Sequence, residues 1–383
     1  MDKLKEVLQK QLKEIVPYDS EIDLLKIKLK QVLDVLNKNI KSKKIKAKVF
    51  LGGSYAKNTL IKKKRYDVDI FIRFNKNYSE SDLNNLLKKI VPKDSKLLHG
   101  SRNYYNYTIN NFDFEIIPVI EIKKPIEARN VTDLSYFHVN YIKDKIKKKP
   151  KIADEIRLSK AFTYYQECYG AESYIMGFSG YALELLMTYY ESFSKFIKVV
   201  AKLDLNKNNK IIIDPAKFFK NSNEILKTIN KAKSQSPIVF IDPTFKERNA
   251  LAALSIETFK EFQKSCKKFI KSPSEKFFIL KNKKQEFEKK YKKQFNIIEI
   301  FTKKQSGDIA GTKLKKFYRY FIKETSKFFN IKSNDFEYSE SENKGIVYLA
   351  VQPKKQMIIQ GPPIKMKKAY TAFKKQHKNK NII

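Results

Sequence analysis

The chain begins with apolar residues at the spacing of amphipathic helices. Those between Leu4 and Ile15 recur three or four positions apart, and Pro17, which has no amide hydrogen to continue a helix, follows them. A second run of this kind extends from Ile22 to Leu36. The N-terminal segment is therefore predicted to be helical.

The pattern then changes to that of strands. Residues 81–91 keep a helical spacing, and Asn110-Asn111 is a turn signal between two strand-like runs. The runs rich in β-branched and aromatic residues are 47–51, 67–74, 104–109 and 112–122. Helices and strands are thus expected together in this part of the chain.

Farther along, helical spacing dominates from residue 151 to 270, with interruptions at 177–180 and 204–215. Residues 140–151 are rich in lysine and are expected to form a basic connection at a domain boundary. The last part predicts a small α+β module with a basic tail, Lys374–Asn381. Its strand-like runs are Glu337-Tyr338, Gly345–Val351 and Met357–Ile359, and its helix-like runs are Leu314–Phe329 and Lys365–Lys375.

Charge points to a polyanionic partner. The 383 residues contain 80 Lys and Arg against 41 Asp and Glu, a formal net charge of +39. Although AT-rich coding would also raise the lysine content, so basic a protein repels itself unless it meets a polyanion, and nucleic acid is favoured. Two cysteines without a CxxC pair and three scattered histidines indicate no disulfide scaffold or zinc site. With no signal-peptide core and no membrane-spanning run, we expect a cytoplasmic protein without a membrane partner.

A turn and two carboxylates give the strongest chemical signal. Gly53-Ser54 follows a predicted strand, where free backbone amides can hold a phosphate. Asp67 and Asp69 lie two positions apart on a strand, so both carboxylates point to one face, roughly 6–7 Å apart. This spacing suits two-metal phosphoryl chemistry, for which Mg²⁺ is the preferred cation.

A third acid is expected on a neighbouring strand, where Asp113 and Glu115 share one face of an apolar segment. A buried acid needs compensation, and a metal ion supplies it. A Gly-Ser pair or an Asp-x-Asp pair alone occurs by chance. The ordered combination of turn, acidic pair and later acid is specific, and it predicts a metal site.

These residues resemble the active-site motifs of the DNA polymerase β-like nucleotidyltransferase superfamily. Later segments narrow the resemblance to the archaeal, class I CCA-adding tRNA nucleotidyltransferases, and it runs from about residue 40 to the C-terminus. The segments that carry it are Val131–His138, Asp154–Phe162, Tyr169–Glu172, Gly177–Tyr181, Asp242–Asn249 and Gly361–Pro363.

The resemblance makes Asp67, Asp69 and Glu115 the catalytic and metal-binding acids. The family usually has Asp at the third position, so Glu115 is a departure, and the choice between it and Asp113 stays open. A second departure is at residues 133–136, where the family's Asp-Arg-Thr-Pro element has lost its arginine.

The resemblance also implies nucleotide-binding residues. Lys160 and Tyr169 would contact the triphosphate, and His138 would lie near the sugar or phosphates, unless they are a solvated lysine, a packed aromatic and a structural histidine. The implied set is Gly53, Ser54, Lys57, His138, Lys160, Tyr169 and Arg248.

Arg248 would read the base. Cytosine and adenine share an amino donor beside a ring-nitrogen acceptor, whereas uracil and guanine present the reverse. An arginine, which only donates, together with one acceptor would therefore select C and A. The alternative is that Arg248 only begins a helix near Ala250–Phe262.

The implied fold is multidomain α/β. Residues 1–140 would form a polymerase β-like palm, residues 141–257 a helical nucleotide-pocket domain like those of poly(A) polymerases and oligoadenylate synthetases, and residues 258–383 a ferredoxin-like, RNA-binding α+β module with a tail.

The implied function is CCA addition without a nucleic-acid template. The 3′-hydroxyl of a tRNA acceptor arm would attack the α-phosphate of CTP or ATP, with Mg²⁺ as cofactor and pyrophosphate leaving. The sequence does not fix the oligomeric state and allows a homodimer. Two alternatives stay open: a related RNA nucleotidyltransferase such as a poly(A) polymerase, and a non-catalytic RNA-binding protein on a decayed palm.

Overall fold

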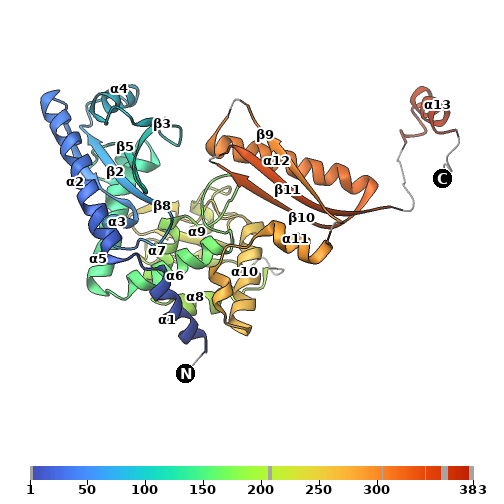
Figure 1. Cartoon of the computed structure of the whole chain (residues 1–383), viewed down its shortest axis with the longest axis horizontal. Coiled ribbons are helices and arrows are strands. Elements are labelled where there is room, and N and C mark those ends of the chain that lie inside the picture. The colour runs from blue at the N-terminus through green and yellow to red at the C-terminus, as the bar shows by residue number, and fades with distance from the viewer. Residues whose placement is uncertain are drawn as a thin grey trace. The chain divides into compact units, whose positions relative to one another are not determined.

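The computed structural model describes residues 3–205, 209–292, 294–303, 305–340, 342–354 and 361–378. By its internal contacts the chain forms two compact units, Met1–Lys281 and Asn282–Ile383 (Figure 1). Within the described residues, no helix is both long and apolar enough to cross a membrane.

A five-stranded sheet organises the N-terminal part of the first unit. Its strand order is β1-β2-β5-β4-β3, and β2 and β5 are parallel while the other neighbours are antiparallel. The strands are β1 (Ala47–Leu51), β2 (Tyr66–Phe74), β3 (Lys96–Leu98), β4 (Tyr104–Ile109) and β5 (Phe112–Ile120). The predicted strands are confirmed, whereas the exposed edge strand β3 had no clear signal in the sequence.

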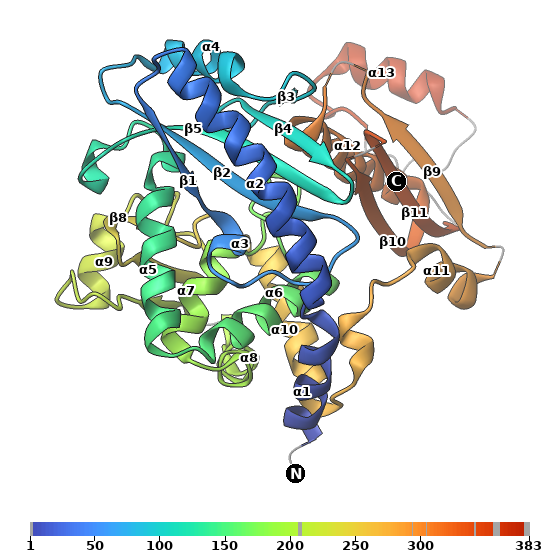
Figure 2. The same cartoon turned by 60° about the vertical axis from the view of Figure 1, so that its left-hand side comes forward.

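Helices α2 (Asp19–Ser42) and α4 (Glu80–Ile90) cover one face of this sheet (Figure 2). Their apolar residues form one core with the alternate inward residues of β2 and β5, among them Leu36, Leu87 and Val68. Helix α1 (Lys3–Ile15) contacts the helices below the sheet. The predicted N-terminal helices and the break at Pro17 are therefore confirmed.

Below the sheet, helices enclose a second core rich in phenylalanine. Phe162 lies at its centre, with ring contacts to Phe193, Phe262 and Phe269. The helices are α5 (Ser135–Lys148), α6 (Ile152–Tyr165), α7 (Gly180–Tyr190), α8 (Phe193–Lys202) and α10 (Ile256–Lys271). Residues 156–163 of α6 are all buried, so this helix is the axis of the core.

One expectation for this region is wrong and another is incomplete. Most of the segment 140–151 is not an irregular connection, since α5 extends to Lys148 and buries Ile142. Residues 151–270 also contain a small sheet in the order β6-β7-β8. It is formed by β6 (Ile211–Ile213), β7 (Ile238–Asp242) and β8 (Phe245–Asn249), and α9 (Ser222–Thr228) lies between the first two strands in sequence.

The second unit is an α+β module, as predicted. Its antiparallel sheet has the order β10-β11-β9, and the sequence order β9-α12-β10-β11 corresponds to part of a ferredoxin-like pattern. The elements are α11 (Lys283–Tyr291), β9 (Asn296–Phe301), α12 (Gly307–Phe328), β10 (Phe329–Ser339), β11 (Lys344–Pro353) and α13 (Lys367–Gln376). The expected strand Met357–Ile359 and the end of the predicted tail lie outside the described residues.

The division by contacts falls after Lys281, because α10 and Phe278 pack into the phenylalanine core of the first unit. The proposed domains at 1–140, 141–257 and 258–383 stay a prediction.

Candidate active site

The predicted phosphate-binding turn lies directly against the acidic strand. Gly53 begins the short helix α3 (Gly53–Ala56) with a φ of +60°, and a Cβ atom there would come within 1.6 Å of Asp69 Oδ2. The Gly52 amide also donates to the backbone carbonyl of Asp69, at 2.9 Å. Only glycine can occupy position 53 without displacing the carboxylate, so the turn and the acid form one site.

The strand register places the acids in two pairs. Asp67 is opposite Asp113 and Asp69 is opposite Glu115 across the parallel β2–β5 pairing. Arg65 donates hydrogen bonds to both carboxylate oxygens of Asp113, at 2.9 and 3.1 Å. The Thr108 hydroxyl donates a third hydrogen bond to this carboxylate, at 2.5 Å. Asp113 is therefore engaged in an ion pair, and the choice between Asp113 and Glu115 as the third catalytic acid stays a prediction.

The carboxylates fit a divalent cation by charge. Burial raises the pKa of Asp69, and the neighbouring Asp67 adds to this while Lys57 opposes it. A cation between these acids would relieve that cost. In the part of the chain that the structure describes, no three His, Cys, Asp or Glu side chains already stand in a ligand arrangement. The acids would therefore have to turn toward a cation, from backbone positions that the register fixes.

Two lysines from different segments meet on one buried acid. Lys57 Nζ lies 2.6 Å and Lys160 Nζ 2.8 Å from opposite oxygens of Glu184, whose side chain is 1 % exposed. Lys160 also donates to Thr59 Oγ1 at 3.1 Å. Burial opposes the charge of Glu184, but the two ammonium groups outweigh it and hold the pKa of this acid below its ordinary value. Lys160 is thus a buried, paired cation rather than a solvated helix lysine.

Asp67 and Lys160 both line one small pocket of about 40 Å³. Four of the predicted site residues, Ser54, Asp67, Lys160 and Tyr169, are among those that line it. Tyr169 is held in place because its backbone pairs with that of Phe178, so it lies beside the start of α7. The fold therefore brings together the residues expected to hold a triphosphate.

A second buried carboxylate, Asp242, organises the other predicted residues. Its Oδ2 lies 2.7 Å from Arg248 Nη1 and 3.1 Å from His138 Nε2. Its Oδ1 accepts a hydrogen bond from Tyr181 at 3.1 Å, and the His138 ring stacks on the Tyr181 ring with centroids 4.0 Å apart. His138 therefore lies with Arg248 in the described structure, and its expected contact with sugar or phosphates stays a prediction.

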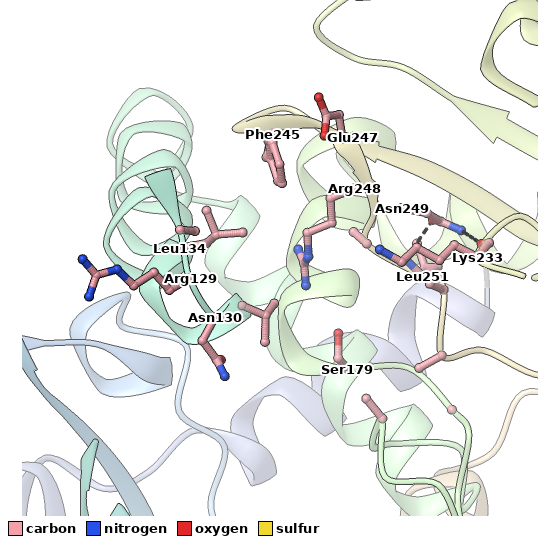
Figure 3. A pocket seen from close by; sticks show the side chains of 17 residues that line it. Arg129, Asn130, Leu134, Ser179, Lys233, Phe245, Glu247, Arg248, Asn249 and Leu251 are labelled. Carbon is pink, nitrogen blue, oxygen red and sulfur yellow. Dashed lines mark hydrogen bonds between the residues drawn. The ribbon is translucent and has the colours of Figure 1, made fainter. Parts of the chain in front are cut away.

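Arg248 lies in strand β8 and points into a pocket of about 440 Å³ (Figure 3). The alternative that it begins a helix is wrong, since the next helix starts at Ile256. Asn130 and Leu134 line one side of this pocket, and Ser179 lies on another. The pocket has the size of a small-ligand site, and its open guanidinium donors suit the edge of a base.

The altered segment at residues 133–136 has a structural task. The Asp133 carboxylate is buried and accepts hydrogen bonds from Arg102 and from the backbone amides of Ile120, Arg129 and Asn130. The following residue, Leu134, packs in the core of the five-stranded sheet. This segment thus holds in place Asn130 and Leu134, which line the Arg248 pocket.

Two residues of this site, Glu184 and Asp242, were not assigned a role from sequence. Glu184 is a lone acid in a helix that is otherwise apolar, which is a usable signal for a buried ion pair. Asp242 ends the apolar run of β7 and could have been noticed in the same way. The pairing of Glu184 with Lys57 could not be predicted in this way, because these residues are 127 positions apart.

Comparisons with known proteins agree with this geometry. The family "tRNA nucleotidyltransferase, second domain" matches residues 154–279, and the "Second Messenger Oligonucleotide or Dinucleotide Synthetase domain" matches residues 2–135. The CCA-adding enzyme of Nanoarchaeum equitans is 36 % identical over 55 % of this chain and 52 % of its own length. That of Methanocaldococcus jannaschii is 31 % identical over 72 % of this chain and 61 % of its own length. The chain thus spans about three fifths of these curated relatives or less.

Solved structures share the fold. One is a cytoplasmic RNA terminal U-transferase, with a TM-score of 0.55 and 12 % identity over 73 % of this chain and 99 % of that one. Another is E. coli CdnC with ATP, with a TM-score of 0.53 and 14 % identity over 72 % and 95 %. The resemblance to nucleotidyltransferases supports a divalent metal cofactor in general terms. The chain is thus similar in sequence to archaeal CCA-adding enzymes, and it shares its fold with the RNA terminal U-transferase and with CdnC.

Proposed function

We propose that this protein is a cytoplasmic, CCA-adding tRNA nucleotidyltransferase that extends tRNA 3′ ends with C, C and A from CTP and ATP. The observation that carries the proposal is the joint placement of Ser54, Asp67, Lys160 and Tyr169 around one pocket, beside Asp69 on the same strand. The similarity to archaeal CCA-adding enzymes at 30–36 % identity supports the choice of substrate. The net charge of +39 supports a tRNA partner, and a homodimer stays a prediction.

In this proposal the chain's own groups divide the work. The amides of the Gly53-Ser54 turn and the ammonium groups of Lys57 and Lys160 bind the triphosphate and offset the charge that builds up on pyrophosphate. Asp67, Asp69 and Glu115 would hold Mg²⁺, which when bound polarises the α-phosphate and favours loss of the 3′-hydroxyl proton.

Base choice would come from Arg248. Its guanidinium can donate to the ring nitrogen of cytosine or adenine but meets another donor on uracil or guanine. An unpaired buried polar group costs about 1–3 kcal/mol, so two mismatches would give roughly a thousandfold discrimination.

The direct test is single-nucleotide incorporation with purified chain and tRNAs that end before C74, C75 or A76 of the terminal CCA. The expected result is C, C and A in that order and no further extension. Long A-tracts on any RNA would instead indicate a poly(A) polymerase, and no incorporation would favour the non-catalytic alternative. Chelation of divalent cations should stop the reaction, and Mg²⁺ should restore it.

The catalytic assignment has its own test. Asp69→Asn keeps the shape of the side chain and removes its charge, so incorporation should fall by orders of magnitude while tRNA affinity is nearly unchanged. Asp113→Asn is the matched control, because that acid is engaged by Arg65. Near-normal turnover of Asp69→Asn with Mg²⁺ would refute the assignment. Loss of incorporation in Asp113→Asn would indicate that Asp113, and not Glu115, is the third metal-binding acid.

A further inference from the structure

The Asp242 carboxylate is completely buried, yet it lies next to the pocket that Arg248 enters. Its side chain is 0 % exposed, so it cannot itself contact a nucleotide. Five polar atoms surround it. Besides Arg248, His138 and Tyr181, the amide and hydroxyl of Thr244 donate to Oδ1 at 2.8 and 2.7 Å. A carboxylate held from this many directions has one orientation.

The Asp242 carboxylate is ionised in spite of its burial. Burial opposes ionisation of Asp242, but His138 and Arg248 outweigh burial and hold its pKa well below the ordinary range. His138 is itself buried, and burial lowers the pKa of its imidazole. Arg248 is always charged and therefore balances Asp242, and its side chain remains 23 % exposed.

An arginine on a strand at the rim of a pocket has many rotamers and would otherwise turn its charged end toward water. With Nη1 bound at 2.7 Å, one end of the planar guanidinium is held in place, which limits the orientations that its coplanar atoms can take. The Tyr181 ring adds a further limit, since Arg248 Cζ lies 5.5 Å from its centroid. The remaining donors of the fork are thus presented to the pocket in one direction (Figure 3).

We propose that Asp242 is a positioning residue for nucleotide selection: by fixing the Arg248 guanidinium, it determines that the pocket accepts bases with a ring acceptor beside an amino group. The inference rests on the proposed function and deepens it. Selectivity belongs in this view to the Asp242–Arg248 pair, and not to arginine alone.

The test compares incorporation of CTP and UTP into tRNA that lacks CCA, by wild type, Asp242→Asn and Thr244→Val. In Asp242→Asn the ratio of kcat/KM for CTP to that for UTP should fall at least tenfold, toward the value of Arg248→Ala. In Thr244→Val, which removes one hydrogen bond to the same carboxylate but keeps the ion pair, the ratio should stay within threefold of wild type. The ratio does not depend on the fraction of active enzyme, so partial unfolding does not imitate the result.

Adding Asp242→Asn to Arg248→Ala should change the ratio no further, since both act through the same guanidinium. If Asp242→Asn yields no folded protein, Asp242→Glu keeps the charge and shifts the carboxylate by one methylene, and the same fall is expected. An equal loss with CTP and UTP at an unchanged ratio would overturn the proposal and leave Asp242 a general structural residue.

Failure of the proposed function looks different. A wild-type chain that incorporates nothing, or takes UTP as well as CTP, contradicts CCA addition itself. Without turnover, competition between CTP and UTP for binding in the presence of that tRNA carries the same comparison of variants. Equal affinities in wild type would then refute the role of Asp242 as well.

Discussion

Two buried carboxylates in the first unit do similar work with different cations. Glu184 holds the ammonium groups of Lys57 and Lys160, and Asp242 holds the guanidinium of Arg248 beside the ring of His138. Both acids are 1 % exposed or less. Their pKa values are lowered by these cations in spite of burial.

The difference lies in the geometry that each cation can offer. A lysine is a compact charge with freely rotating donors, which suits a phosphate oxygen approached from any side. An arginine is a flat fork, which suits the planar edge of a base if its tilt is fixed. The Glu184 cluster is therefore expected to set how tightly any nucleotide is held, and the Asp242 cluster to set which nucleotide is chosen.

Arg248→Ala should have the largest effect on nucleotide choice, and it therefore distinguishes the Asp242 cluster from the Glu184 cluster most clearly. Loss of the guanidinium removes the donor that separates C and A from U and G, so most of the roughly thousandfold preference for CTP over UTP should vanish. Steady-state incorporation of the four nucleotides measures it. A folded variant that keeps the wild-type ratio would place base choice elsewhere.

Glu184→Gln should act on all nucleotides alike. The variant leaves two buried ammonium groups without a counter-charge, which costs about 3–5 kcal/mol of stability and loosens both lysines. We expect kcat/KM to fall roughly a hundredfold for CTP and ATP, equivalent to about 2.7 kcal/mol, while the CTP-to-UTP ratio stays constant. Thermal unfolding checks the first effect and incorporation the second. A changed ratio would mean that the two clusters are not separate.

Lys57→Met is the milder form of the same change, because Glu184 keeps Lys160 as its partner. The KM for CTP and for ATP should each rise about tenfold, or 1.4 kcal/mol. The KM for tRNA should not move. Lys64→Met is a useful control, since Lys64 is exposed and, in the described part of the chain, is not among the recorded ion-pair partners of Glu184.

Tyr181→Phe should have the smallest effect. It removes one hydrogen bond to Asp242 but keeps the ring on which His138 stacks. A single such bond contributes about 0.5–1.5 kcal/mol, and a value near the lower end corresponds to a drop of about threefold in the CTP-to-UTP ratio. Parallel assays with Arg248→Ala show how large the change in the CTP-to-UTP ratio is when the guanidinium is absent. A larger loss than in Asp242→Asn would make the tyrosine, rather than the carboxylate, the main support of Arg248.

Local patterns predicted the parts of the site that lie close together in sequence. Asp67 and Asp69 share a face because a strand repeats every two residues, and the turn at Gly53 is similarly local. The Glu184 cluster could not be foreseen, since the acid meets Lys57 only through tertiary folding. The strand Ile238–Asp242 was not recognised within a stretch where helical spacing dominates, because a short buried apolar run has no diagnostic period. Residues 140–151 were misread because their lysines concealed the buried Ile142.

Helix α7 holds the Asp242 cluster and the Glu184 cluster at a fixed distance from each other. Tyr181, which supports Asp242, and Glu184, which supports the lysines, lie three residues apart on it, a rise of about 4.5 Å. Substitutions can alter what either end recognises, but the separation between them is set by the helix backbone. An inserted residue between them would turn Glu184 by about 100° and carry it away from both lysines. In the proposed function, this helical turn would therefore set the distance between the groups that select the base and those that bind the phosphates.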